Sequence, residues 1–488
     1  MISVIGLELD HAGAKVIAID LDGTLTLTDT LHESVMRLVR DRPLAAFALP
    51  VWLLKGKAHL KAQITDRICL NPALLPYNAE FLEWLKAQKA AGHQLVLCSA
   101  TDRRIAESVA QHLGLFDQVI ASDGKTNIAG HHKRATLDQT FGTAGYDYAG
   151  NSSADIPVWQ GARAAVVVNA KDSVLKQAKA VSAVETIIAP STVALSVWRK
   201  VFRVHQWLKN LLLFIPLLAA HQLGNVNALE TLLLAFVAFS ACASAVYITN
   251  DLLDLESDRQ HPRKCKRPFA SGAVPILFGA LLAPLLMVLA LGLAAFVGPV
   301  FFGWLIAYFA LTTAYSLSLK RYALIDCLTL AGLYTLRIIA GAAAVGVTLS
   351  FWLLAFSTFI FLSLAFVKRY AELQVQAAHG STSAHGRGYS VSDAPLIQTL
   401  GITAGYASVL VLALYLNSEA VVQLYTQPQI IWLAVPVMLF WISWVWLKAH
   451  RGQMHDDPIV FAIKDKASLF VGLLLASIFA AASVWGRG

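Results

Sequence analysis

The chain has 488 residues, of which 57% are hydrophobic and 14% are charged, and its mean hydropathy is +0.58. This composition is too apolar for an ordinary soluble protein and excludes a disordered chain. Residues 1–198 carry 19 Lys and Arg against 19 Asp and Glu, whereas residues 199–488 carry 20 against 12, so the net charge of +8 belongs to the second part. A basic excess beside long apolar stretches indicates a membrane bilayer and anionic ligands, and the lack of basic low-complexity segments argues against nucleic acid as a partner.

The first 190 residues predict an α/β domain. Short apolar runs at residues 16–19, 95–98 and 164–168 alternate with amphipathic helical segments, which is typical of a parallel sheet. Residues 44–54 are apolar but only about half as long as a membrane-spanning helix, so a buried cap helix or an interfacial contact explains them better. The N-terminus lacks the pattern of a secretory signal, and the five scattered cysteines indicate neither disulfides nor a zinc site. We therefore expect this domain in the cytoplasm.

Four segments of this domain carry residues suited to phosphate chemistry. Asp20 and Asp22 follow the first apolar run, so both carboxylates project from a strand end toward one pocket. Such a pair can bind Mg²⁺ and attack phosphorus, because the cation offsets the repulsion between a phosphate and an anionic nucleophile. The other segments contribute, in chain order, Ser99, Lys133 and the pair Asn151 and Asp155.

In this order the four segments resemble the haloacid dehalogenase-like phosphatases, over nearly all of residues 14–170. The resemblance implies a Rossmann-like domain over residues 1–190, with a helical cap at about residues 25–92. It also implies that Asp20 is the nucleophile and Asp22 the general acid/base. Further implied roles are phosphate binding by Ser99 and Lys133, and Mg²⁺ binding by Asp20, Asp22, Asn151 and Asp155.

One position departs from that family. The phosphatases often have an aspartate where this chain has Asn151. An amide oxygen binds Mg²⁺ more weakly than a carboxylate does. An active phosphatase and a catalytically dead scaffold both remain open at this stage.

From residue 210 onward, nine apolar stretches approach the length that a membrane span needs. With the first domain inside, the cytoplasmic loops hold fourteen Lys and Arg, whereas the opposite loops and the C-terminus hold only Arg487. This asymmetry predicts an odd number of spans, a cytoplasmic N-terminal domain at the inner membrane and an outside C-terminus. The stretches lie at about 210–222, 231–249, 274–294, 297–316, 323–344, 350–367, 396–417, 428–447 and 468–486.

The second apolar stretch ends in a cluster of acidic residues. Asp251, Asp254 and Asp258 are spaced by three and four positions, so we expect them on one face of a helix, flanked by Asn250. Several like charges on one side of a membrane helix are costly unless a cation binds them. Mg²⁺ with a diphosphate fits this need, with Lys and Arg near the phosphate oxygens. The basic candidates that follow in the chain are Lys264 and Arg267.

This Asn-Asp-x-x-Asp-x-x-x-Asp helix end resembles the UbiA superfamily of intramembrane prenyltransferases, over about residues 198–488. The resemblance implies an all-α membrane domain of about nine helices at residues 191–488. Its members usually hold a second aspartate cluster after the sixth span, where this chain has Lys368, Arg369 and Glu372. Exchanging anions for cations converts a metal site into an anion site, which suits a phosphate that arrives without its own Mg²⁺.

In that exchange, and in the segments 206–210, 258–262 and 386–390, the chain resembles the polyprenyl-phosphate phosphoribosyltransferases of this superfamily. In that subgroup a polyprenyl phosphate attacks C1 of phosphoribosyl diphosphate, and diphosphate leaves. The resemblance implies Mg-diphosphate on Asp251, Asp254 and Asp258. The sugar 5-phosphate is expected on Lys368, Arg369 and Arg387, with Tyr389 flanking and Glu372 on the ribose hydroxyls. Lys209, Arg203 and Arg337 are candidates for a phosphate, and Asp326 for pairing with a cation.

Other functions remain open at this stage. Prenyl transfer from a prenyl diphosphate to an aromatic or other small acceptor would use the same aspartates with the lipid as electrophile. A transporter or a membrane-anchored phosphatase would leave the aligned aspartates without a role. Because the expected transferase product keeps a 5-phosphate, the fused phosphatase domain suggests that Asp20 removes it. Nothing in the sequence defines an oligomeric state.

Overall fold

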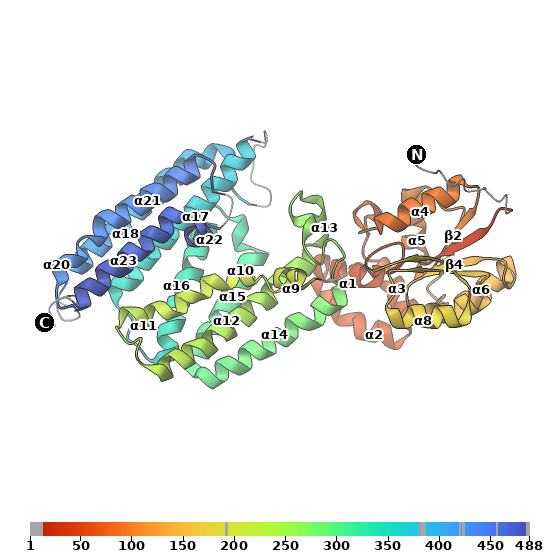
Figure 1. Cartoon of the computed structure of the whole chain (residues 1–488), viewed down its shortest axis with the longest axis horizontal. Coiled ribbons are helices and arrows are strands. Elements are labelled where there is room, and N and C mark those ends of the chain that lie inside the picture. Colours follow the sequence, from red (N-terminus) through yellow and green to blue (C-terminus); the bar gives the residue numbers. More distant parts are fainter. Residues whose placement is uncertain are drawn as a thin grey trace, which may run out of the picture. The chain divides into compact units, whose positions relative to one another are not determined.

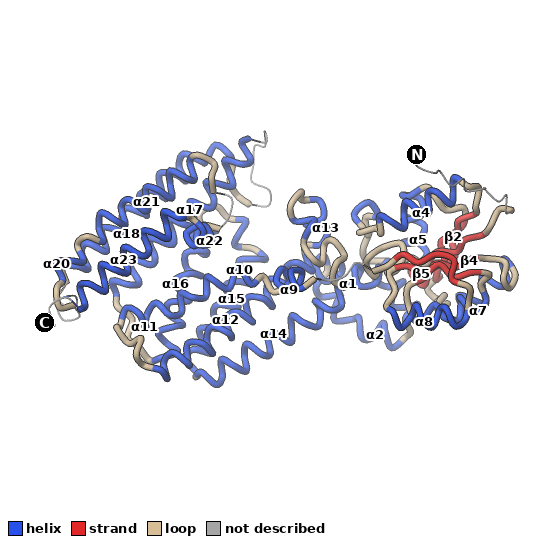
Figure 2. The backbone as a smooth tube through the Cα atoms, in the orientation of Figure 1, coloured by secondary structure: helices blue, strands red, loops and turns tan. Residues whose placement is uncertain are grey.

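The computed structural model describes residues 13–190, 194–378, 380, 387–418, 421, 425–454 and 457–484. The chain forms two compact units, which we call unit 1 (Met1–Val201 with Ile248–Leu282) and unit 2 (Phe202–Tyr247 with Ala283–Gly488). Unit 1 contains the sheet, and the described residues of unit 2 are helices and loops (Figures 1 and 2). An α/β domain followed by a helical membrane region is therefore confirmed.

The sheet of unit 1 has six parallel strands in the order β3-β2-β1-β4-β5-β6. Residues 16–19 and 164–168 form strands as predicted, and 95–98 lie within β2. Because the strand order changes direction between β1 and β4, the carboxyl ends of these two strands border the crevice that binds ligands in such sheets. The strands are β1 (Val16–Ile19), β2 (Gln94–Asp102), β3 (Gln118–Ser122), β4 (Asp147–Gly150), β5 (Ala164–Val168) and β6 (Val184–Ile188).

Helices cover both faces of the sheet, so strands β1 and β5 are apolar throughout. Alternate residues of β1 enter different apolar clusters: Ile17 and Ile19 pack with Phe81 and Leu85, whereas Ala18 packs with Trp159. This alternation follows from the two-residue period of a strand. The covering helices are α4 (Ala79–Ala90), α5 (Arg103–Leu113), α6 (His131–Phe141), η3 (Ser153–Asp155), α7 (Ile156–Gly161) and α8 (Asp172–Val181), and α9 (Leu195–Val201) follows the sheet.

Between β1 and α4 the chain forms short helices. Leu38, Leu60 and Ile64 make a small core of their own. The apolar residues 44–54 are largely on the surface, and Leu54 is 89% exposed, so they do not form the buried cap helix that we considered. The segments are α1 (Thr30–Asp41), η1 (Pro43–Ala48), α2 (Leu49–Leu54), α3 (Lys57–Thr65) and η2 (Pro72–Leu74).

Among the described residues, eight helices are long and apolar enough to cross a membrane. The ninth expected span, 210–222, is instead a series of short helical turns that ends before His221, whose φ of +57° interrupts the helix. The predicted sidedness depends on the count of spans and stays a prediction. The long helices are α12 (Val226–Leu253), α14 (Ile276–Val297), α15 (Pro299–Leu317), α16 (Ile325–Val345), α17 (Phe351–Ala378), α18 (Ala394–Leu416), α20 (Pro428–Ile431) with α21 (Ala434–His450), and α23 (Lys466–Val484).

Shorter helical segments connect the long ones. Two of them belong to unit 1, namely α13 and η5, and the rest to unit 2. They are α10 (Val204–Trp207), η4 (Leu208–Phe214), α11 (Ile215–Ala219), α13 (Leu255–Gln260), η5 (Lys264–Lys266), η6 (Leu319–Arg321), η7 (Val391–Asp393) and α22 (Pro458–Lys464).

Helix α16 joins the two apolar cores of unit 2. Its Tyr334 and Ile338 pack in a core with residues of α17, α18 and α21, whereas its Leu333 and Ala340 pack in a core with η4, α12 and α15. Because one side of α16 is buried between these two cores, the polar side chains on that side must find partners inside the bundle. This central helix therefore organises the buried polar groups of unit 2.

Candidate functional site

The first candidate site lies at the carboxyl end of β1. The N–H of Asp20 donates to the carbonyl of Ala149 at the end of β4 (2.9 Å), which fixes Asp20 at the sheet crevice. Its carboxylate is buried and accepts a hydrogen bond from Lys133 Nζ (2.7 Å). Burial raises the pKa of Asp20 to about 7, Lys133 opposes the rise, and the nearby Asp155 and Asp22 add to it. A further cation at this position would favour the carboxylate anion.

Lys133, on α6, links Asp20 to the end of β4. Its ammonium also donates to the Tyr148 hydroxyl (2.8 Å), which in turn donates to Asp155 Oδ1 (2.8 Å). Burial lowers the pKa of Lys133, but the carboxylates of Asp20 and Asp155 outweigh burial and hold this pKa above its ordinary value. Lys133 therefore remains a cation beside the expected nucleophile.

Asp22 is held by the start of α1. Its carboxylate accepts from the Thr30 N–H (2.7 Å) and from the Thr101 hydroxyl (2.6 Å), and the two threonine hydroxyls lie 2.8 Å apart. Burial, with Asp29 nearby, raises the pKa of Asp22, while these hydrogen bonds oppose the rise. A carboxyl group with a raised pKa can carry a proton, as a general acid must. Ser99 is buried, and its hydroxyl accepts from the Thr101 N–H (3.2 Å).

Asp155 and Asn151 have different surroundings. Both oxygens of Asp155 are already bonded, because Oδ2 accepts from the N–H groups of Asn151 (3.0 Å) and Ser152 (2.9 Å) and Oδ1 accepts from Tyr148. The amide of Asn151 packs against Gly23, where an added Cβ would overlap it and where φ is +77°. Asp155 thus fixes the loop that brings Asn151 to the Asp20–Asp22 turn. Metal binding by these two residues stays a prediction.

The second candidate site is the acidic loop, which we define as residues 250–272 of unit 1. Asp251 and Asp258 are buried, and both accept from Arg267, at 3.0 Å and 2.6 Å from its Nη1. Burial raises the pKa of Asp258, and the Arg267 guanidinium opposes the rise. Two carboxylates therefore converge on a single cation.

The helix does not continue unbroken through this loop. Helix α12 ends at Leu253, and Asp254, with φ −101° and ψ 14°, precedes α13. The N–H groups of Asp254 and Asp258 still bond to carbonyls four residues earlier. The expectation of one continuous helix is therefore wrong at Asp254, a residue type that favours helix ends over interiors. Asp254 and Asn250 are half-buried, and Lys264 is exposed.

Within the described ranges, no group of three or more His, Cys, Asp and Glu side chains could hold a metal ion. The donor chemistry nevertheless fits Mg²⁺ at both sites, because Mg²⁺ prefers oxygen ligands and usually takes one or two carboxylates together with water and substrate phosphates. Asp20, Asp22 and Asn151 would hold it at the first site. Asp251 and Asp258, which here share the Arg267 cation, would hold it at the second.

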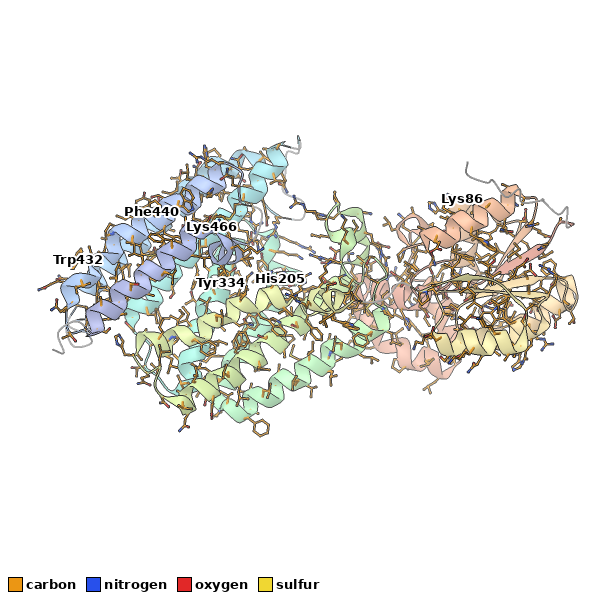
Figure 3. All side chains as sticks on the ribbon, viewed as in Figure 1. Lys86, His205, Tyr334, Trp432, Phe440 and Lys466 are labelled. Atoms are coloured by element: carbon orange, nitrogen blue, oxygen red, sulfur yellow. The ribbon has the colours of Figure 1, made fainter. Side chains whose placement is uncertain are left out.

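Unit 2 contains a buried cationic cluster, which we define as Lys209, Lys368, Tyr334, Arg337 and Asp457. Asp457 Oδ2 lies 2.7 Å from Lys209 Nζ and 3.4 Å from Lys368 Nζ. The Tyr334 hydroxyl donates to the same carboxylate (3.2 Å), and Tyr334 is labelled in Figure 3. Lys209 and Asp457 are mostly buried, whereas the Lys368 side chain is 29% exposed. The structure thus brings together two of the predicted phosphate ligands.

Arg337 extends this cluster one turn along α16. Its guanidinium donates to Asn210 Oδ1 (2.9 Å), to the Leu333 carbonyl and to the Tyr308 hydroxyl (2.9 Å). These three hydrogen-bond partners are all neutral. The cationic cluster therefore contains three basic side chains and one carboxylate, and this excess of positive charge suits an anion.

Arg369 and Asp326 form a second buried ion pair in unit 2. Both side chains are 0% exposed, and Arg369 Nη2 lies 2.6 Å from Asp326 Oδ2, so the predicted pairing of Asp326 with a cation is confirmed. Glu372 pairs with Arg369 and lies 3.5 Å from Arg387 Nε. Tyr389 is also buried, and its hydroxyl accepts from the Leu324 N–H (2.8 Å). Both predicted sugar-phosphate ligands in this group already have acidic partners, and Arg387 is partly exposed whereas Arg369 is fully buried.

Arg203 has its guanidinium 4.8 Å from the centre of the Tyr247 ring. Its φ of +50° places it at the turn before α10. A basic side chain stacked on an aromatic ring is a common arrangement that needs no ligand. Phosphate binding by Arg203 stays a prediction.

Sequence reasoning missed three site residues. Asp457 precedes Pro458 and caps α22 by accepting from the Ile459 N–H (3.2 Å), so its sequence context indicates a helix cap. Tyr148 contacts Lys133 and Asp155, and Thr101 contacts Asp22, and both sets of contacts form only in the folded chain. A sequence signal existed for Thr101 alone, because it follows the predicted strand that carries Ser99.

These sites define a membrane protein with three clusters suited to phosphate-bearing ligands, namely the Asp20 site, the acidic loop and the cationic cluster. Comparison with known proteins identifies its family. Residues 211–484 match the UbiA prenyltransferase family, and residues 52–160 match the haloacid dehalogenase-like hydrolases. The chain belongs to the UbiA prenyltransferase family and carries an N-terminal haloacid dehalogenase-like domain. Both family resemblances drawn from the sequence are thereby confirmed.

Three relatives illustrate this membership. The chain is 36% identical over 479 residues to "Uncharacterized protein y4nM" of Sinorhizobium fredii, covering 97% of this chain and 92% of that protein. It is 36% identical over 282 residues to "Nodulation protein NoeC" of Azorhizobium caulinodans, covering 57% and 91%. It is also 38% identical over 188 residues to the "Decaprenyl-phosphate phosphoribosyltransferase" of Mycobacterium tuberculosis, covering 37% of this chain and 62% of that protein.

Proposed function

We propose that the membrane part transfers a 5-phosphoribosyl group from phosphoribosyl diphosphate to a polyprenyl phosphate, with Mg²⁺ required and diphosphate released. The observation that carries this proposal is the excess of positive charge in the cationic cluster, in which Asp457 pairs with Lys209 and Lys368 while the guanidinium of Arg337 bonds to the neutral Asn210. A phosphate-bearing acceptor would neutralise that excess, whereas an aromatic acceptor would not. The similarity to a decaprenyl-phosphate phosphoribosyltransferase supports the same substrates.

Each cluster has a distinct role in this reaction. The aspartates of the acidic loop would hold Mg²⁺, which would offset the charge of the leaving diphosphate, and Arg267 would then be released from the aspartates to bind the diphosphate oxygens. Lys209 and Arg337 bind the lipid phosphate, and Lys368 and Arg387 bind the sugar 5-phosphate. The bond from C1 to the diphosphate breaks, and a bond from C1 to a lipid phosphate oxygen forms. The lipid phosphate is already an anion at neutral pH, so no base is required.

The N-terminal domain supplies a second step in this proposal. Asp20 attacks the 5-phosphate of the lipid-linked product, and Asp22 protonates the ribose oxygen that leaves. Water then releases inorganic phosphate from the aspartyl-phosphate, with Asp22 accepting its proton. The final product is a polyprenylphosphoryl ribose. Fusion of the two activities keeps a scarce lipid intermediate at a high effective concentration near the second site.

The direct test incubates the purified full-length chain with phosphoribosyl diphosphate, polyprenyl phosphate and Mg²⁺, and separates the lipid products. Wild type is expected to release diphosphate and phosphate, Asp20→Asn to stop at the phosphorylated lipid, and Asp254→Ala to give neither lipid product. If wild type and Asp20→Asn yield the same phosphorylated lipid and no free phosphate, the second step is wrong.

Prenyl transfer to a small acceptor is the competing reaction, and the same preparation distinguishes it. Labelled prenyl diphosphate would then be consumed in the presence of an aromatic acceptor, without phosphoribosyl diphosphate. Our proposal predicts no such consumption. A membrane-anchored phosphatase without transferase activity would instead leave phosphate release from a supplied phosphoribosyl lipid unchanged in Asp254→Ala and form no lipid from phosphoribosyl diphosphate.

A further inference from the structure

A buried ion pair joins the phosphatase fold to the acidic loop inside unit 1. Arg259 Nη2 and Nη1 lie 2.5 Å and 3.1 Å from the two oxygens of Glu33, and the two side chains are 7% and 3% exposed. Arg259 Nε donates to the Ala270 carbonyl (2.8 Å) within the same loop. The guanidinium is thus bonded on two sides, which fixes its orientation.

The surroundings of this pair form an extended contact. Glu256 and Arg259 of α13 pair with Arg37 and Glu33 of α1, so each helix contributes one acid and one base to the contact. At the end of the acidic loop, Gly272 has φ +75°, and an added Cβ would lie 2.7 Å from Leu27 Cβ. Close backbone approach and reciprocal charges specify how the loop and α1 align, which is the best-attested use of a buried ion pair.

Each partner of the pair lies close in the chain to a residue of a candidate site. Glu33 lies three residues after Thr30, whose N–H donates to Asp22 (2.7 Å) and whose hydroxyl contacts Thr101. Arg259 directly follows Asp258, one of the two aspartates that share Arg267. The first turn of α1 therefore both orients Asp22, through Thr30, and pairs with Arg259, through Glu33. Asp258 and Arg259 are neighbours in α13.

We propose that Glu33 and Arg259 are positioning residues for the phosphatase reaction, so that the loop that binds diphosphate also sets the orientation of Asp22. This inference rests on the proposed function for its physiological substrate. Neither residue touches the phosphate. Their pairing keeps the first turn of α1 in place, and with it the Thr30 N–H that orients the general acid.

The first test measures hydrolysis of para-nitrophenyl phosphate by the full-length protein in detergent. Arg259→Gln is expected to lower kcat about tenfold with KM changed less than about twofold, because binding of the phosphate is untouched. Arg259→Lys, which retains the charge, is expected to recover part of the loss. In Glu33→Gln/Arg259→Gln the loss should equal that of one single variant, since both remove one interaction.

A matched control removes a charge from the same domain without touching the contact. Glu83 pairs with Lys86 on the surface of α4, where Lys86 is labelled in Figure 3. Glu83→Gln is expected to leave kcat unchanged. If Arg259→Gln melts at the wild-type temperature and keeps the wild-type kcat, the positioning role is wrong.

A second measurement does not depend on turnover. Hydrogen exchange of the full-length protein is expected to be at least about tenfold faster over residues 29–36 in Arg259→Gln, with α4 unchanged. Unchanged exchange over α1 would overturn the inference even if the domain hydrolyses no aryl phosphate. Failure to form a phosphoribosyl lipid would refute the proposed function alone, because neither measurement uses phosphoribosyl diphosphate.

Discussion

Asp20 is a buried carboxylate that has one cationic neighbour, Lys133, and two acidic ones, Asp22 and Asp155. Its pKa of about 7 means that the proton and Mg²⁺ compete for the same oxygens near neutral pH. Only the anion can attack phosphorus or bind the metal. The site is therefore sensitive to pH in a range where an ordinary aspartate is fully ionised.

At the residue scale, we expect phosphate release at low Mg²⁺ concentration to rise with pH through about 7, because Asp20 loses its proton there. Saturating Mg²⁺ should move the midpoint to lower pH, since the cation favours the anion. The measurement is the pH profile of phosphate release at two Mg²⁺ concentrations. If the midpoint of the pH profile is the same at both Mg²⁺ concentrations, the titrating group is not Asp20.

Lys209 offers a second prediction at this scale. Lys209→Met should raise the KM for polyprenyl phosphate by roughly tenfold to a hundredfold, because a hydrogen bond to a charged group contributes about 1.5–3 kcal/mol. Lys466→Met, at the exposed lysine that begins α23, is the matched control and should leave KM unchanged. Transferase kinetics at varied lipid concentration measure both. Equal KM values in the two variants would mean that Lys209 does not bind the lipid phosphate.

The sequence was sufficient to place Asp20 and Asp22 at the carboxyl end of the first strand, where ligands bind in such sheets, and the family resemblance was needed to bring Lys133 to the same site. Asp457 could not be predicted in the same way. It lies 248 positions from Lys209, and their contact depends on how the helices of unit 2 pack. Hydropathy defines which segments enter the membrane but not which polar side chains then meet.

At the element scale, α16 packs against the short helix η4 through a glycine. An added Cβ on Gly341 would overlap the backbone carbonyl of Leu213, which cannot rotate away. Gly341→Ala is therefore expected to destabilise the protein by about 1–3 kcal/mol. Thermal unfolding in detergent measures the loss. Gly332→Ala, on the open side of the same helix, should leave the melting temperature unchanged or raise it slightly.

The segment 210–222 shows where hydropathy reasoning overestimates an element. Its residues are apolar, yet Lys209 and Asn210 turn inward to polar partners, and the helical turns that follow are short. Local composition cannot distinguish a span from a buried connection that packs on a neighbouring helix. The strands at 16–19 and 164–168 were predicted correctly because β-branched and small apolar residues there are bounded by turn residues.

At the scale of the whole molecule, the distribution of Lys and Arg predicts which loops face the cytoplasm. In intact cells, a membrane-impermeant maleimide should label Asn225→Cys and should not label Ser392→Cys until the cells are permeabilised. Cys69 and Cys265, both on the expected inner side, provide an internal control. The reverse pattern would mean that the chain is inserted in the opposite orientation.

The Glu33–Arg259 contact also has a consequence for attempts to divide this protein. A single proteolytic cut between β6 and α9 would not release the N-terminal domain as a free fragment. The salt bridges between α1 and α13 would still hold it to the C-terminal fragment. Two polypeptides would then copurify as one nicked complex. If the gene is split at the same place, we expect folded protein only when both halves are expressed together. Each half alone would contain one buried charge of the Glu33–Arg259 pair without its partner.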